Sequence, residues 1–133
     1  MNKAIELAAV TNGKMSGTLF VVAWGYETSH TWGHKAEIHK DGRIVAAAKI
    51  TYCNRTWETY RFQSVIHFAL HDFVVAETGI NPNKEICKRD TKPMKSAEAE
   101  ARRLERVAAH DFAVALYKNL TAEVDGEYAV KAA

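Results

Sequence analysis

Two histidines on one predicted helix are the residues whose types and spacing best suit metal chemistry. His67 and His71 stand four residues apart, and Asp72 follows directly. Imidazoles at positions i and i+4 lie on one helical face, where they can ligate zinc. A working site needs further ligands, and the spacing places none. A metal-dependent enzyme built on these three residues is therefore one hypothesis, and a pair of helix-surface histidines beside an apolar stripe is the simpler interpretation.

The other reactive residues lack the neighbours that their chemistry requires. Cys53 follows a predicted strand, but the sequence places no histidine or cationic group beside it to lower the pKa of its thiol. The glycine-containing stretch 13–17 lacks the spacing of a phosphate-binding loop. The His-Asp pairs at 71–72 and 110–111 would suit a His-Asp phosphohydrolase, but those enzymes are all-helical and the first half of this chain predicts strands. We therefore predict a protein that is not an enzyme and carries no cofactor.

Composition bounds the class of protein. The chain has 133 residues, of which 47% are hydrophobic and 26% charged, with a formal net charge of +2. These values fit one globular domain and disfavour a disordered chain. Two cysteines without zinc spacing, and a start without a secretory leader, predict a cytoplasmic protein with reduced thiols. No apolar run approaches the roughly 18 residues of a membrane span, so no membrane partner is expected.

The hydrophobic pattern predicts a single α+β domain over residues 1–120, with an antiparallel sheet of three or four strands between about 18 and 61. The run 18–25 is continuously apolar, which is typical of a strand buried on both faces. Asp41 and Gly42 favour a two-residue hairpin turn, because both central positions of a type I′ turn need positive φ. The predicted strands are 18–25, 34–40, 43–52 and 56–60.

Beyond the predicted sheet, the spacing of the apolar residues changes to that of a helix. Apolar residues recur at three- and four-residue steps over about 62–78 and again over 96–119. Two long helices are therefore expected to pack mainly on one face of the sheet. Residues 2–10 have helical composition and predict a short N-terminal helix. The stretch 80–95, with both prolines, is predicted to be an exposed basic linker, and the tail 121–133 is expected to fray.

Basic residues gather in this linker and at the start of the helix that follows it. Clustered Lys and Arg side chains are what phosphate contacts require, so a nucleic-acid partner is the second hypothesis. Acidic residues such as Asp90 and Glu100 dilute the cluster, and an ordinary solvated surface would explain the same pattern. The predicted nucleic-acid-binding residues are Lys88, Arg89, Lys92, Arg102, Arg103 and Arg106.

Aromatic residues near the predicted bends suit contacts with another protein. Trp24 is expected in the core, whereas Trp32 is expected in a loop and Trp57 just past a bend. Tryptophan, tyrosine and arginine are enriched in interface hot spots, and exposed rings also stack on bases. A local cluster that caps the sheet would explain the same residues. The predicted partner-binding residues are Trp32, Arg55, Trp57 and Tyr60.

The segment 52–65, YCNRTWETYRFQSV, resembles a pattern found in small proteins of phages and mobile elements. Those proteins show Tyr-x-Asn-Arg-Thr-Trp-Glu, an aromatic residue and then a helix. The resemblance implies an accessory gene product, and some such products inhibit CRISPR or restriction systems by binding them. Our leading hypothesis is therefore a non-enzymatic inhibitor that occludes a host or phage protein complex in the bacterial cytoplasm. A homo-oligomer is compatible with it, because two copies cover more area.

Overall fold

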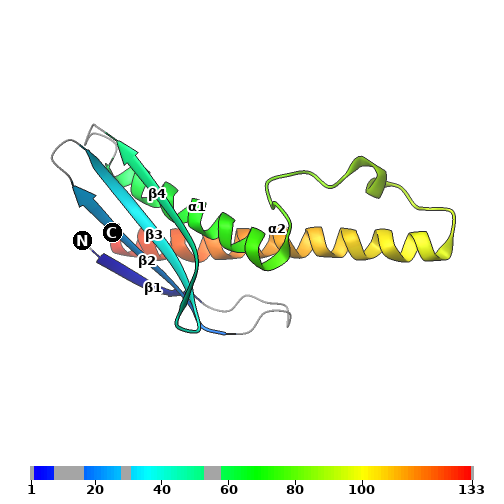
Figure 1. Ribbon diagram of the computed structural model, residues 1–133, viewed down its shortest axis with the longest axis horizontal. Coiled ribbons are helices and arrows are strands. Elements are labelled where there is room, and N and C mark those ends of the chain that lie inside the picture. Colours follow the sequence, from blue (N-terminus) through cyan, green and yellow to red (C-terminus); the bar gives the residue numbers. More distant parts are fainter. Residues whose placement is uncertain (1, 8–16, 28–30, 53–57, 133) are drawn as a thin grey trace.

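A computed structural model describes residues 2–7, 17–27, 31–52 and 58–132. The four strands form one antiparallel sheet whose spatial order follows the chain, β1-β2-β3-β4, and two long helices come after it (Figure 1). The predicted α+β class and antiparallel sheet are thus confirmed. The elements are β1 (Asn2–Leu7), β2 (Leu19–Glu27), β3 (Trp32–Lys40), β4 (Arg43–Tyr52), α1 (Glu58–Thr78), the 3₁₀ helix η2 (Lys88–Thr91) and α2 (Ala97–Ala132).

Local sequence signals place several boundaries correctly. Asp41 and Gly42 form the β3–β4 turn with φ values of 51° and 83°, as a type I′ turn requires. The Asp41 carboxylate also accepts a hydrogen bond from the Thr18 N–H at 2.9 Å, which ties the turn to the start of β2. Gly79 ends α1 with a φ of 72°, and the Ser96 hydroxyl caps α2 by accepting the N–H of Ala99 at 3.1 Å.

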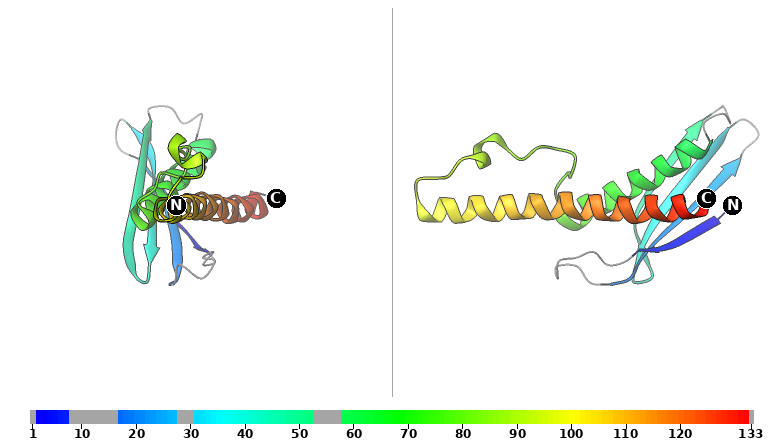
Figure 2. Two further views of the ribbon diagram at one scale, coloured as in Figure 1. Left: turned by 90° about the vertical axis from the view of Figure 1, so that its right-hand side faces the viewer. Right: turned by 180° about the vertical axis from the view of Figure 1, so that it is seen from behind.

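The core lies between the sheet and the two helices, which cover the same face of the sheet (Figure 2). Val21, Ile38 and Ala46 stand opposite one another on the three adjacent strands β2, β3 and β4. Because opposed residues of an antiparallel sheet share a face, this row points toward the helices. The buried core residues are Leu19, Val21, Ala23, Ala36 and Ile38 of the sheet, Val65, Ile66, Ala69, Leu70, Phe73 and Val74 of α1, and Ala113, Leu116, Leu120 and Val124 of α2.

No helix of the described ranges covers the opposite, open face of the sheet, and the predicted burial of residues 18–25 on both faces or nearly so was wrong for that face. Along β2, Leu19, Val21 and Ala23 are buried, whereas Phe20 is 36% exposed and Trp24 is half-buried. The apolar run therefore belongs to a strand with a helix-covered face and a face that no described helix covers. The expectation that Trp24 lies in the core was wrong for the same reason.

Residues 2–7 form a strand, so the predicted helix over residues 2–10 was wrong for them, and residues 8–10 lie outside the described ranges. Within β1, Ile5 stands opposite Val21 of β2, and the pairing extends from Asn2 to Leu7. The alanine-rich composition favours a helix when the segment is considered alone. The edge of β2, however, offers a row of backbone hydrogen-bond partners, and this tertiary pairing overrides a weak local preference.

Helix α1 begins at Glu58, inside the segment 56–60 that was predicted to be a short strand. The strand prediction was wrong for residues 58–60, and residues 56 and 57 lie outside the described ranges. A carboxylate at the start of a helix is favoured by the helix dipole, which agrees with Glu58 in the first turn. With β1 at one edge and β4 at the other, the sheet reaches four strands without this segment.

Helix α2 continues to Ala132, so the predicted end near residue 119 and the frayed tail at 121–133 were wrong. Leu120 and Val124 are fully buried against the core. Gly126 lies within this part of α2, and a glycine in a helix interior costs about 1 kcal/mol relative to alanine. Burying two aliphatic side chains contributes more than that, roughly 1.5–3 kcal/mol each.

The N-terminal half of α2 projects beyond the sheet (Figures 1 and 2). The segment that precedes α2 runs alongside this half, from the end of α1 out to the start of α2. We call residues 79–96 the strap, and the strap together with residues 97–112 of α2 the arm; the rest of the described chain is the body. Helix α2 has 36 residues, about 54 Å at 1.5 Å per residue. No helix in the described ranges is both long and apolar enough to cross a membrane.

Candidate functional site

A buried carboxylate anchors the strap to α2. Asp90, in η2, is 4% exposed, and its carboxylate accepts hydrogen bonds from Arg106 Nε at 3.0 and 3.1 Å and from Arg106 Nη2 at 2.7 Å. This is the two-point geometry that guanidinium–carboxylate pairs favour. The hydrogen bond from Arg106 holds the pKa of Asp90 below its ordinary value. Burial acts in the opposite direction and raises this pKa, and the positive charges of Arg106, Arg89 and Arg103 lower it further. Asp90 is therefore charged at neutral pH.

A second cluster fixes the strap within η2 and just after it. Arg103 Nη1 donates to the Asp90 carbonyl oxygen at 3.0 Å, and Arg103 Nε donates to the Glu100 carboxylate at 3.0 and 3.1 Å. Glu100 Oε2 also accepts the Met94 N–H at 2.5 Å. The hydrogen bond from Arg103, and then that from Met94, lower the pKa of Glu100. One ion pair within α2 thus holds two points of the strap.

Histidines fasten the beginning of the strap. His110 Nε2 donates to the Lys84 carbonyl oxygen at 2.8 Å, so this nitrogen carries the proton. His71 Nε2 lies 2.9 Å from Asn81 Oδ1, which connects α1 to the strap. Together with the Asp90 and Glu100 clusters, these contacts restrain the strap along its length.

The contacts divide the predicted nucleic-acid-binding residues into two groups. Arg103 and Arg106 are occupied by Glu100 and Asp90, so their role in this structure is to hold the arm together. Arg89 is 68% exposed, and its Nε stands 3.8 Å from Asp90, beyond hydrogen-bond distance. The exposed cations of the arm are Lys84, Lys88, Arg89, Lys92, Lys95 and Arg102.

The strap is more positive at its surface than its sequence indicates. Between Lys88 and Lys95, a stretch described throughout, all four cations are exposed and the single carboxylate, Asp90, is buried. Arg102 is 69% exposed and approaches Glu98 at 4.0 Å. A sequence count cannot reveal this separation, because it gives a buried, paired carboxylate the same weight as an exposed one.

The histidines proposed as metal ligands face different partners. His67 Nε2 stands 2.8 Å from Asp125 Oδ1 on α2, whereas His71 Nε2 meets Asn81. Asp72 is 62% exposed, with its Oδ1 3.7 Å from His71 Nδ1. Within the described ranges, no group of three or more His, Cys, Asp and Glu side chains is placed to hold a metal ion. The metal-enzyme hypothesis therefore gains no ligand set from this part of the chain.

The residues proposed for a protein partner are mostly outside the described structure. Arg55 and Trp57 lie in the segment 53–57, outside the described residues, and Tyr60 is placed in α1 by its backbone alone. Trp32 begins β3 and is half-buried, so its predicted position in a loop was wrong. The protein-binding surface stays a prediction.

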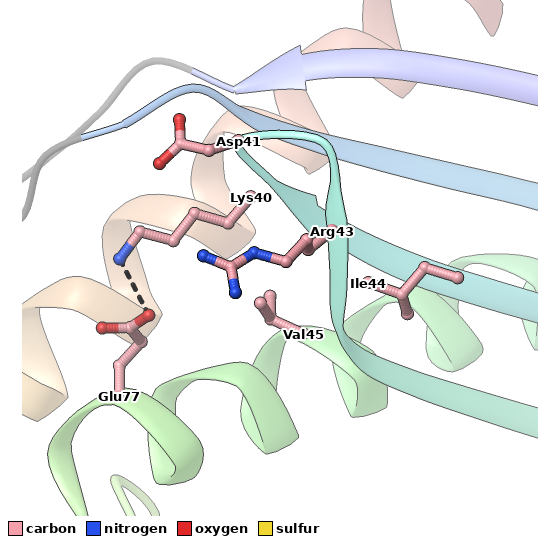
Figure 3. A pocket seen from close by; sticks show the side chains of 6 residues that line it. All are labelled: Lys40, Asp41, Arg43, Ile44, Val45 and Glu77. Carbon is pink, nitrogen blue, oxygen red and sulfur yellow. Dashed lines mark hydrogen bonds and ion pairs between the residues drawn. The ribbon is translucent and has the colours of Figure 1, made fainter.

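A polar pocket of about 520 Å³ lies where the β3–β4 hairpin meets the end of α1 (Figure 3). Lys40 Nζ donates to Glu77 Oε1 at 2.9 Å across this space, and the exposed Arg43 side chain extends toward it. The sequence did not indicate this pocket, because hairpin register and helix packing together bring its residues close. Glu77 is paired with Lys40 and the Asp41 carboxylate accepts the Thr18 N–H, so both carboxylates that line the pocket are already engaged.

Comparison with known proteins gives no relatives: no protein-family model, no curated protein and no solved structure matches the chain. The function must therefore be argued from the geometry of the described residues.

Proposed function

We propose that this chain is a non-enzymatic nucleic-acid-binding protein whose arm contacts the phosphate backbone. The observation that supports this proposal is that two carboxylates of the arm form ion pairs with arginines of the arm itself. Asp90 is paired with Arg106 and Glu100 with Arg103. Between Lys88 and Lys95 the cations therefore meet solvent with no exposed carboxylate among them, and exposed carboxylates such as Glu85 and Glu98 lie elsewhere on the arm.

The geometry suits phosphate contacts in two ways. Exposed Lys and Arg side chains bind nucleic acid by displacing the counterions condensed on it, so clustered cations are favoured. The contacts that restrain the strap also lower the conformational entropy that would be lost on binding. Because the arm projects from the body (Figure 1), a long polyanion can approach it from several sides.

Binding of a fluorescently labelled oligonucleotide, measured by anisotropy at several salt concentrations, tests this proposal. Lys88→Ala with Arg89→Ala is compared with Arg43→Ala with Lys118→Ala, which removes one exposed Lys and one exposed Arg from outside the arm. We expect the arm variant to bind more weakly and to reduce the slope of log affinity against log salt by about 2, or roughly 1 per lost phosphate contact. Equal effects of the two variants, or no binding by the unaltered chain, would contradict the proposal.

A phage or mobile-element inhibitor that occludes a host defence complex is the second candidate. An exposed apolar stripe on the arm favours it: Ala101, Leu104 and Ala108 are all exposed, and Leu104 is 53% exposed. Their spacing of i, i+3 and i+7 is that of helices that bind in a partner's groove. A defence complex retained from nuclease-treated host lysate, lost with Leu104→Asp and kept with Phe68→Asp, would support this candidate. Phe68 is a matched exposed residue on α1.

A further inference from the structure

The open face of the sheet carries a column of apolar and aromatic residues on β2, one of the two central strands. In Figure 1 this face is turned toward the viewer, with the helices behind it. Strand register and burial assign its members, since alternate residues of a strand share a face. The residues that register places on this face are Asn2, Ala4 and Glu6 of β1, Phe20, Val22, Trp24 and Tyr26 of β2, Gly33, Lys35, Glu37 and His39 of β3, and Ile44, Ala47, Lys49 and Thr51 of β4.

Tyr26 is fixed at one end of this column. Its ring lies over Gly33, where an added Cβ would stand 2.4 Å from Tyr26 Cζ. Its hydroxyl hydrogen-bonds the Thr51 hydroxyl, and Lys35 Nζ sits 5.3 Å from the ring centroid. The Tyr26 ring is therefore engaged by Gly33, Thr51 and Lys35, and among the described aromatic residues of the column the rings of Phe20 and Trp24 are left to contact a ligand.

The charges around the column favour an anionic ligand. Lys35 stands opposite Lys49 on the adjacent strands β3 and β4, and Lys49 is exposed. Two carboxylates share this face by register: Glu37, whose Oε1 lies 3.2 Å from His39 Nε2, and Glu6 of β1, which stands opposite Phe20, whereas Trp24 stands opposite Lys35. Two lysines close to the half-buried Trp24, in a column that also holds the exposed Phe20, suit a ligand that has both flat apolar groups and negative charge.

A second copy of this chain fits the face less well. A nine-residue strand spans about 30 Å and four strands about 19 Å, so the face covers roughly 570 Å². A stable protein–protein interface takes roughly 800 Å² from each partner. Facing copies would also have to accommodate two pairs of lysines within this small area.

We infer that the open face binds the unpaired bases of a single-stranded nucleic acid. Bases stack on Phe20 and Trp24, and Lys35 and Lys49 lie beside them for the phosphates. Base stacking on exposed aromatic residues of a four-stranded sheet is a recognised mode of single-strand binding. The inference rests on the proposed function and deepens it: the arm supplies backbone affinity, and the open face selects single strands over duplex.

The test measures the affinity of the full chain for a labelled oligothymidylate and for a duplex of equal length, at one salt concentration. We expect Phe20→Ala and Trp24→Ala each to weaken single-strand binding roughly tenfold and to leave duplex binding unchanged, since a duplex offers no unpaired bases. Trp24→Phe keeps a ring and should restore most of the affinity. Phe68→Ala, which removes an exposed ring from α1, should change neither affinity. The thermal melt of each variant shows whether it folds. If Trp24→Ala does not fold, the affinities of Phe20→Ala provide the test.

The outcomes separate this inference from the proposed function. If folded Phe20→Ala weakens both ligands equally or neither, while Lys88→Ala with Arg89→Ala weakens both, the open-face inference is overturned and the arm proposal stands. If the unaltered chain binds neither ligand, both fail. A dimer in solution that Phe20→Asp converts to a monomer would show that a second copy covers the face, and would also overturn the inference.

Discussion

The body and the arm of this molecule are held together by different forces. The body buries a continuous set of aliphatic and aromatic side chains between the sheet and two helices. In the arm, every residue from 83 to 112 is exposed or half-buried except Asp90. Burial therefore stabilises the body, whereas a few charged hydrogen bonds orient the arm.

Because of this difference, we expect the body to determine the stability of the fold and the arm to move without unfolding it. Burial of a large apolar side chain contributes roughly 1.5–3 kcal/mol, so the body should unfold as one cooperative unit. Solvent screens the partly exposed Glu100–Arg103 pair, and the Asp90–Arg106 pair joins the strap to the projecting half of α2 rather than to the core, so both contribute little to the stability of the body. The strap should therefore open locally without unfolding of the body, as segments with few buried contacts do. The following predictions test that separation, from the largest expected effect to the smallest.

The first prediction concerns the centre of the body. Phe73 is fully buried on α1, and Phe73→Ala should lower the free energy of unfolding by about 3–5 kcal/mol through lost burial and the resulting cavity. Phe68→Ala is the matched control, because Phe68 lies on the same helix and is 58% exposed. Chemical denaturation measures both variants, and equal losses would show that the burial assigned to α1 is wrong.

The second prediction concerns the end of α2. Leu120 is fully buried, so Leu120→Ala should cost about 2–5 kcal/mol. Asn119→Ala changes the exposed neighbouring residue and should alter stability little. A neutral Leu120→Ala would restore the prediction that the chain beyond about residue 120 is frayed.

The third prediction concerns the arm alone. Arg106→Ala leaves the buried Asp90 carboxylate without its two-point partner and should release the strap. Limited proteolysis should then cut residues 84–95 at least several times faster, with little change in the melting temperature of the body. Arg102→Ala removes an arginine that stands 4.0 Å from Glu98 and should leave the strap protected. A large drop in melting temperature with Arg106→Ala would show that arm and body are not separable.

The fourth prediction is the pH dependence of the strap. The folded-state pKa of Asp90 is lowered from 3.8 and that of Glu100 from 4.5. A lowered folded-state pKa means that the stabilising contribution is complete above the unfolded-state value and is lost as pH falls through the folded-state value. The strap should therefore stay attached from neutral pH to about pH 4.5 and detach below that. Carboxyl NMR signals report the titrations; an Asp90 pKa at or above its ordinary value would contradict the assigned pair.

Structural features that depend on residues close together in the chain were predictable from the sequence. The Asp41–Gly42 turn and the apolar face of α1 follow from local backbone and helical-period rules. The strand at residues 2–7 was missed because its conformation depends on the edge of β2, which is distant in the chain. The run at 18–25 shows that a strand is apolar on two sides, but it does not show whether a second layer covers it.

The candidate site was predictable as a cluster of basic residues but not as a surface. Asp90 and Arg106 are separated by 16 residues, and no periodic pattern links a loop carboxylate to one arginine of a helix. Their pairing decides which cations face solvent. The sequence therefore indicated Arg103 and Arg106 as ligand contacts, whereas their side chains are engaged within the arm.

The slope of log binding affinity against log salt concentration tests the central claim most directly. Exposed cations of the arm that neutralise three or four phosphates predict a slope of about −2 to −3 on single strands, at roughly −0.7 per contact. Lys88→Ala, Arg89→Ala and Lys92→Ala together should make that slope shallower by about 2, at the same value per lost contact. An affinity that does not depend on salt, or a slope unchanged by the triple substitution, would contradict the assignment of the arm as a phosphate-binding surface.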